Sequence, residues 1–205
     1  MEQLIKTVIL GVIQGLTEWL PISSTGHLKV AERLLGLTVP LVFDVVLHIG
    51  TLAVVLVFFR SDVKEVLVAL ARLDFKTDYG RLIPLIIVGV IPTVIIGLLL
   101  DMFLENVLQS LSTVALAFIM CGFVLYVAKF GSEKIDKIGF KEALLVGVAQ
   151  GLAVVPGLSR SGLTIAIALL LGIRRKQAFK FSFLLSIPAV AGALAWTVYT
   201  EFGEL

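Results

Sequence analysis

Reactive side chains gather in two short stretches of this sequence. The first, GLTEWLPISSTGHL (residues 15–28), holds a glutamate, two serines, two threonines and one of the two histidines of the chain, around Pro21. The second, PGLSRSG (residues 156–162), places an arginine between two serines shortly after a proline. If the two stretches meet in the folded protein, these groups are suited to binding and cleaving a phosphate ester or anhydride.

Each stretch also places hydroxyl groups where a helix is expected to start. Serine and threonine that follow a proline break can cap the next helix, and the free N–H groups at a helix N-terminus bind anions. The arginine adds a permanently charged fork that matches phosphate oxygens. The residues predicted to bind phosphate are Ser23, Thr25, Gly26, Gly157, Ser159, Arg160 and Ser161.

Two pairs of residues are spaced one helical turn apart. Gln14 and Glu18 share a helix face, so their oxygen atoms could hold a divalent cation that bridges to phosphate. Asp44 and His48 have the same spacing, and they either satisfy each other across one turn or contribute to catalysis. Glu18 and Arg160 are expected to be functional, because a charged side chain within a membrane is costly.

The composition is that of a membrane protein. Of 205 residues, 59% are hydrophobic and 16% are charged, whereas a water-soluble domain carries roughly 25% charged residues. A net charge of +2 is too small to indicate nucleic-acid binding. Four apolar runs are long enough to cross a bilayer: Leu41–Phe59, Leu82–Leu100, Leu111–Ala128 and Phe181–Thr200. The sequence therefore predicts an all-α, polytopic membrane protein.

The two reactive stretches lie inside apolar segments that are too broken to be ordinary spans. Residues 4–37 and 143–173 are each too long for one span and too polar at the centre to face lipid there. Broken backbone at membrane depth is tolerated only inside protein or along a cavity. Each segment is therefore predicted to be a re-entrant helical hairpin that turns near Pro21 or Pro156. Gly-xxx-Gly patterns in both hairpins predict close approach to other helices.

The two hairpins resemble each other. The shift that carries Gln14 onto Gln150 also carries further residues onto identical ones, namely Gly11, Gly15, Ser23, Gly26 and Gly36 onto Gly147, Gly151, Ser159, Gly162 and Gly172. This register divides one membrane domain, residues 1–205, into a first repeat (1–128), a cytoplasmic connection (129–141) and a second repeat (142–205). The second repeat is shortened, because counterparts of two spans of the first would lie beyond Leu205. The chain is then either naturally short or a fragment.

Loop charges predict the orientation of the repeats. Lys and Arg stay on the cytoplasmic side of a membrane. They are abundant in the connections that follow the first and third spans and in the one that leads into the fourth span, and absent from the connection after the second. The first hairpin must then enter from outside and the second from the cytoplasm, which is an inverted repeat of the kind found in secondary transporters.

Both reactive stretches resemble the signatures of one protein family. Residues 14–28 (QGLTEWLPISSTGHL) are similar to the first signature of the undecaprenyl-diphosphate phosphatases, also called bacitracin-resistance proteins, and residues 156–162 to the second. Phe43-Asp44 with Gly50, and residues 181–188 (FSFLLSIP), resemble further family patterns. The resemblance implies a hydrolase of the plasma membrane whose site faces outward. It would convert undecaprenyl diphosphate to the monophosphate and so recycle the lipid carrier for cell-envelope synthesis.

The resemblance also assigns roles to residues. It implies that Ser24 and His27 are the catalytic serine and histidine, that Arg160 binds the diphosphate, and that Gln14 and Glu18 bind Mg²⁺ or Ca²⁺. Glu18 and Arg160 would thus join the catalytic group. Gln14 stands where the family also uses glutamate, which leaves one carboxylate fewer for the metal. The family pattern includes two further membrane helices, whose place a homodimer partner could take.

A transporter or flippase of a phosphorylated lipid is the rival interpretation. An inverted repeat with midplane hairpins serves alternating access as well as catalysis, and a fold does not fix a function. Such a protein would bind or move its lipid without releasing phosphate. The presence of Glu18, Ser24 and His27 in one hairpin favours the phosphatase.

Overall fold

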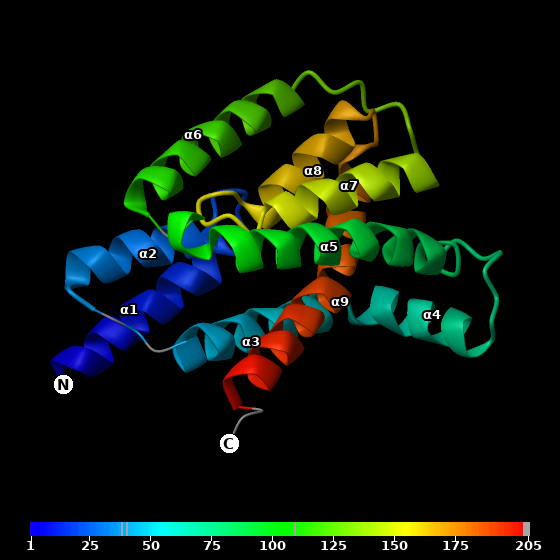
Figure 1. The fold of residues 1–205 in the computed structure, drawn as a ribbon. Helices are drawn as coiled ribbons and strands as arrows, with labels where there is room; N and C mark the ends of the chain where they lie inside the picture. Colours follow the sequence, from blue (N-terminus) through cyan, green and yellow to red (C-terminus); the bar gives the residue numbers. More distant parts are fainter. Residues whose placement is uncertain (38, 40, 109, 203–205) are drawn as a thin grey trace.

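The computed structural model describes residues 1–37, 39, 41–108 and 110–202, and this part of the chain is helical (Figure 1). Its helices are α1 (Glu2–Thr17), α2 (Ser24–Leu35), α3 (Leu41–Phe58), α4 (Arg60–Ala71), α5 (Leu82–Leu108), α6 (Leu111–Ala128), α7 (Phe140–Leu152), α8 (Arg160–Leu170) and α9 (Arg175–Phe202). The predicted all-α class is confirmed.

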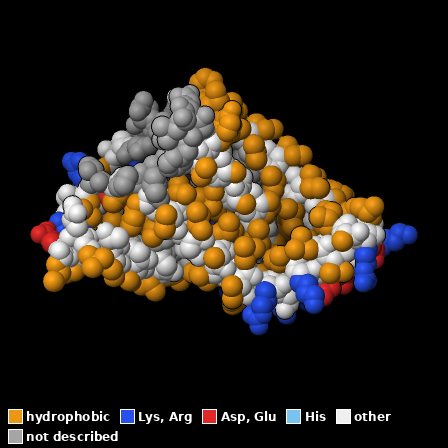
Figure 2. Space-filling view, turned by 90° about the horizontal axis from the view of Figure 1, so that it is seen from below, with side chains coloured by type: hydrophobic (Ala, Val, Ile, Leu, Met, Phe, Trp, Pro, Cys, Tyr) orange, Lys and Arg blue, Asp and Glu red, His pale blue; other side chains and the backbone are white. Residues whose placement is uncertain are grey.

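Several helices are long and apolar enough to cross a membrane. They are Leu82–Leu100 within α5, Leu111–Ala128 and Arg175–Thr200 within α9. The first expected span is α3, which bends by 80° into α4 and so counts as a broken span or a re-entrant loop. Figure 2 shows hydrophobic side chains spread over one face of the molecule, with Lys and Arg at its margins. An exposed apolar surface of this extent suits contact with lipid, so this is a multi-pass membrane protein.

Both predicted hairpins are pairs of packed helices with a turn at the expected place. α1 packs on α2 and α7 packs on α8, and the prolines Pro21 and Pro156 lie in the two turns. Each returning helix starts with a serine cap, Ser23 or Ser159, whose hydroxyl accepts the N–H of the residue three positions later. The capping role predicted for the residues after the proline breaks is therefore confirmed.

Close packing of α7 on α5 fixes the second hairpin. A Cβ on Gly147 would lie 2.1 Å from the carbonyl oxygen of Gly89, and a Cβ on Gly151 would lie 2.8 Å from Cβ of Ile96. Only glycine allows the two helix backbones to approach this closely. The prediction of close helix approach is thus confirmed for α7.

The matching glycines of α1 lack such a neighbour. A Cβ on Gly11 or Gly15 would meet nothing within 4 Å in the described part of the chain. The prediction of close approach by these two glycines is therefore wrong for the described structure, because no other helix lies against this side of α1.

Two further contacts bring the turns to the same place. α6 packs on α8 and also touches α2, so it bridges the two hairpins, and α3 packs on α9 (Figure 1). Next to the end of α3 the packing on α9 is aromatic. Phe59, which lies between α3 and α4, and Phe183 are buried and stacked, and Trp19 from the first turn stacks on Phe183 at 5.1 Å between ring centroids. This packing holds the first turn against α9.

Candidate functional site

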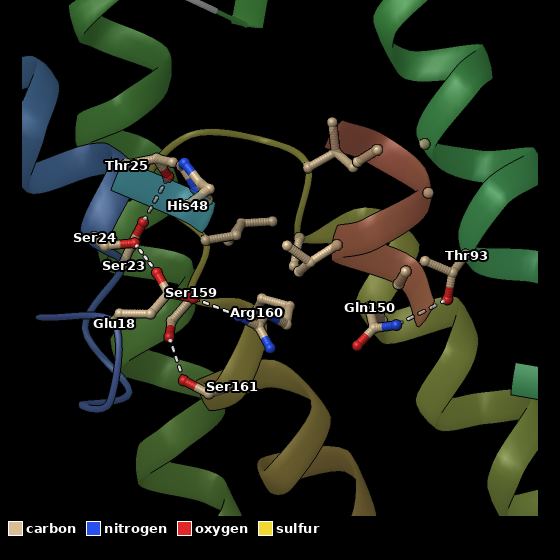
Figure 3. Close-up of a pocket in the computed structure, with 18 of the residues that line it drawn as sticks. Glu18, Ser23, Ser24, Thr25, His48, Thr93, Gln150, Ser159, Arg160 and Ser161 are labelled. Atoms are coloured by element: carbon tan, nitrogen blue, oxygen red, sulfur yellow. Dashed lines mark hydrogen bonds and ion pairs between the residues drawn. The ribbon is translucent and has the colours of Figure 1, made fainter. Parts of the chain in front are cut away.

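The two turns enclose a cavity of about 510 Å³ (Figure 3). Its polar wall carries Glu18, Ser23, Ser24 and Thr25 from the first turn and the start of α2, His48 from α3, Gln150 from α7, and Ser159, Arg160 and Ser161 from the start of α8. The apolar wall comes from α5 and α9 and includes Val94, Leu98, Val190 and Trp196. A concave site with an apolar wall and few converging polar groups is typical of ligand binding.

The two turns are joined by a hydrogen bond from the main chain of one to a side chain of the other. Ser23 Oγ accepts one hydrogen bond from the N–H of Gly26 (3.3 Å) and another from the N–H of Gly157 in the opposite turn (3.2 Å). A Cβ on Gly26 would lie 3.0 Å from Cα of Gly157 and 2.6 Å from the ring of Phe118. The predicted phosphate-binding residues of the two stretches are therefore neighbours in space.

Ser23 itself adopts a strained conformation. Its φ angle is 65°, in the left-handed region that residues other than glycine rarely occupy. The side chain is buried, and its hydroxyl is held by the two amides just described. Strain of this kind persists where the surroundings over-determine it, and it is common at functional sites.

An ion pair joins the two stretches at the centre of the site. The guanidinium of Arg160 donates from Nη2 to Oε1 of Glu18, and the two side chains are 19% and 9% exposed. Oε2 of Glu18 accepts two further hydrogen bonds, from Ser24 Oγ at 2.6 Å and from Gln14 Nε2 at 3.1 Å. A buried carboxylate needs this degree of pairing. The arrangement places the serine hydroxyl directly against a proton acceptor.

The same cluster contains a donor without a partner. Nη1 of Arg160 is buried and has no hydrogen-bond partner in the described part of the chain. The N-termini of α2 and α8 also open at the cavity, because their caps Ser23 and Ser159 line it. A guanidinium with a free N–H and helix N-termini together favour an anion with several oxygens, such as phosphate.

The predicted cation ligands lie beside this cluster. Gln14 and Glu18 are one turn apart at the end of α1, and Oε1 of Gln14 is a buried acceptor without a partner in the described residues. Within those residues no group of three or more His, Cys, Asp and Glu side chains could hold a metal. The chain therefore offers one carboxylate and one amide oxygen, a set that suits an ion completed by phosphate oxygens and water, as Mg²⁺ often is.

The two histidines lie in different surroundings. His27 is not among the residues that line the cavity; its Nδ1 lies 2.7 Å from the carbonyl oxygen of Ser23, and its ring meets Phe118 edge-on. The described contact of the Ser24 hydroxyl is with Glu18 and not with His27. His48, whose role the sequence left open, lines the cavity (Figure 3).

The remaining wall of the cavity was not predicted from the sequence. Gln150 lies at the cavity, and its Nε2 donates to Oγ1 of Thr93 at 3.4 Å. The repeat register offered a signal for Gln150, because it is the counterpart of Gln14. The apolar residues of α5 and α9 carry no such signal, because their pattern is that of any membrane span.

Comparisons with known proteins point to one family. A family model described as "Bacitracin resistance protein BacA" matches residues 7–204. The chain is 46% identical to an undecaprenyl-diphosphatase of Carboxydothermus hydrogenoformans, over 92% of this chain and 70% of the relative. It is also 46% identical to an undecaprenyl-diphosphatase of Desulforapulum autotrophicum (93% and 75% covered) and 44% identical to undecaprenyl-diphosphatase 3 of Bacillus cereus (93% and 72% covered).

Proposed function

This chain belongs to the BacA family of bacitracin resistance proteins, and from that premise we propose that it is an undecaprenyl-diphosphatase of the cell membrane. It hydrolyses undecaprenyl diphosphate to the monophosphate and inorganic phosphate. One observation locates the proposed active site: Ser24 and Arg160 both contact the same buried carboxylate, Glu18. A nucleophile, a base and an anion-binding group thereby converge in one cavity.

The cavity suits both parts of such a substrate. The diphosphate would be held by Nη1 of Arg160 and by the N-termini of α2 and α8, which carry the predicted binding residues Ser23, Thr25, Gly26, Gly157, Ser159 and Ser161. The isoprenoid chain would lie along the apolar wall formed by α5 and α9. Hydrogen bonds and charge thus recognise the head group, and burial of apolar surface holds the tail.

The chemistry starts at Ser24. Its oxygen attacks the terminal phosphorus while its proton passes to Glu18 Oε2, 2.6 Å away. The bond between this phosphorus and the bridging oxygen breaks, and undecaprenyl phosphate leaves with both bonding electrons. Arg160 stabilises the charge that builds on the phosphate oxygens. A water molecule then releases phosphate from the serine, and the proton on Glu18 returns to Ser24 Oγ.

In this arrangement His27 is a positioning residue. The sequence resemblance made it the base for Ser24, but the hydroxyl of Ser24 contacts Glu18 instead. Because a carbonyl oxygen only accepts, Nδ1 of His27 donates to the main chain of Ser23, the residue that caps α2 and bonds the opposite turn. His27 would therefore hold Ser23 in its strained conformation.

A divalent cation, Mg²⁺ or Ca²⁺, fits beside this group. The oxygens of Glu18 and Gln14 would hold it, and the unpartnered Oε1 of Gln14 supports that role. When bound, the cation would neutralise charge on the diphosphate oxygens.

An inverted repeat with an outward-facing site completes the proposal. In favour of the repeat, Ser23 and Ser159 cap α2 and α8 with the same bond pattern. The register counterparts Gly36 and Gly172 follow these helices, both with positive φ, and α3 packs on its register counterpart α9. The distribution of Lys and Arg supports the orientation.

Phosphate release by the purified protein tests the assignment. In detergent with Mg²⁺, the wild-type protein should release inorganic phosphate from undecaprenyl diphosphate. Ser24→Ala should reduce the rate of phosphate release by about three orders of magnitude or more. Binding of the lipid without release of phosphate would instead indicate a transporter or flippase.

A further inference from the structure

The proposed reaction leaves one proton transfer without a residue. Glu18 receives the proton of Ser24 in the first half of the reaction, so it is protonated when the phosphoserine is to be hydrolysed. A protonated carboxyl is the acid that the departing serine oxygen needs, but it cannot also take a proton from water. A second base at the cavity would take this proton from the water.

His48 has the correct tautomer to be this base. Its Nδ1 lies 2.8 Å from the main-chain oxygen of Asp44. Because a carbonyl oxygen only accepts hydrogen bonds, Nδ1 must carry the hydrogen, and the lone pair of the neutral ring is then on Nε2. The bond to the previous helical turn also fixes the ring orientation, as orienting groups do for catalytic histidines.

The position of His48 separates it from His27. Both rings donate from Nδ1 to a carbonyl four residues earlier, so both carry a basic Nε2. His48 lines the cavity together with Glu18, Ser24 and Arg160, whereas His27 does not.

We propose that His48 is the catalytic base that activates the hydrolytic water, an inference that rests on the proposed phosphatase function. Nε2 of His48 takes one proton from water as the water oxygen bonds to phosphorus. The bond between phosphorus and Ser24 Oγ breaks, and Oγ takes the proton held by Glu18. Inorganic phosphate leaves, and His48 returns its proton to solvent.

The experiment uses His48→Asn in the purified full chain. The asparagine amide keeps a donor near Nδ1 for the Asp44 carbonyl and removes the basic nitrogen. With undecaprenyl diphosphate labelled by ³²P in its terminal phosphate, steady-state phosphate release should fall about 10²- to 10⁴-fold. The first turnover should still produce undecaprenyl monophosphate, so labelled phosphoserine should accumulate at Ser24.

Two comparisons make the result specific. His27→Asn, which keeps the donor to Ser23, should not accumulate labelled protein, because His27 takes no proton from water. In His48→Ala, added imidazole should restore part of the phosphate release by replacing the missing ring, and it should not do so in His27→Ala.

Several outcomes would overturn the assignment. They are wild-type turnover in His48→Asn, loss of the first turnover together with the steady state, or failure of imidazole to restore His48→Ala. A wild-type protein that releases no phosphate would instead refute the proposed function, so the two failures are distinguishable.

Discussion

The main-chain N–H of Gly157 donates a hydrogen bond to the hydroxyl of Ser23, a residue 134 positions earlier in the sequence. The same hydroxyl caps α2 through the N–H of Gly26. One side chain therefore starts a helix and joins the two turns that form the cavity. The distance between the hairpins therefore depends on the close packing of Ser23, Gly26 and Gly157.

Adding one methyl group at this contact tests its importance. In Gly26→Ala the new Cβ would lie 3.0 Å from Cα of Gly157 and 2.6 Å from the ring of Phe118, and the backbone atom cannot turn aside. We expect the turns to separate and phosphate release to fall at least tenfold, with a lower thermal midpoint in detergent. Gly122→Ala is the control, because its Cβ would meet nothing within 4 Å. Equal activity of the two variants would refute the prediction.

The ion pair between Glu18 and Arg160 should be more sensitive to single changes than to a double change. Arg160→Gln or Glu18→Gln alone leaves one charge buried without its partner, which costs on the order of 3 kcal/mol. The double variant removes both charges, so its thermal midpoint should lie above that of either single variant. All three should lose phosphate release. If the thermal midpoint of the double variant is lowered by the sum of the two single decreases, the two residues are not coupled in this way.

Matching glycines of the two hairpins should respond differently to alanine. Gly147→Ala places a Cβ 2.1 Å from the carbonyl oxygen of Gly89, so α7 must move away from α5 and the thermal midpoint should fall by several degrees. Gly11→Ala has open space in the described chain, and the higher helix propensity of alanine should leave the midpoint unchanged or slightly raised. Parallel melting curves in detergent check this, and similar losses for both would contradict it.

These glycines show what local sequence can and cannot predict. The pattern around Gly11 is the same as that around Gly147, but only the second has a helix packed against it. The turns and their serine caps were predictable, because prolines and capping hydroxyls act within a few residues. Which helix packs against a Gly-xxx-Gly face depends on the tertiary fold, so the local sequence pattern does not predict it.

The histidines illustrate the same limit within the site. Proximity in the sequence favours His27 as the partner of Ser24, and the resemblance to the family signature points the same way. In the fold, α2 directs His27 toward Phe118, and His48 reaches the cavity from α3. Which side chains line a cavity depends on helix packing, and the apolar wall from α5 and α9 was hidden for the same reason.

Membrane orientation is testable with single cysteines. The native Cys121 is buried, so it should give little background labelling. If Lys and Arg mark the cytoplasmic side, Ser110→Cys should react with a membrane-impermeant maleimide in intact bacteria. Lys137→Cys should react only after the membrane is permeabilised. Lys137 is exposed and its ion pair with Asp78 is a surface one, so the change should not disturb the fold. The opposite labelling pattern would invert the proposed orientation.

The central ion pair also has a consequence for how the chain is assembled in the membrane. Glu18 is synthesised 142 residues before Arg160, and ribosomes add about 5–20 residues per second. At these rates the carboxylate waits roughly 7 to 28 seconds for its partner. An ionised carboxylate in apolar surroundings costs several kcal/mol meanwhile. During this interval the first hairpin must either carry an extra proton or remain near the membrane surface. In the second case its final insertion follows the emergence of the second hairpin from the ribosome, and in the first case the pairing with Arg160 releases the extra proton.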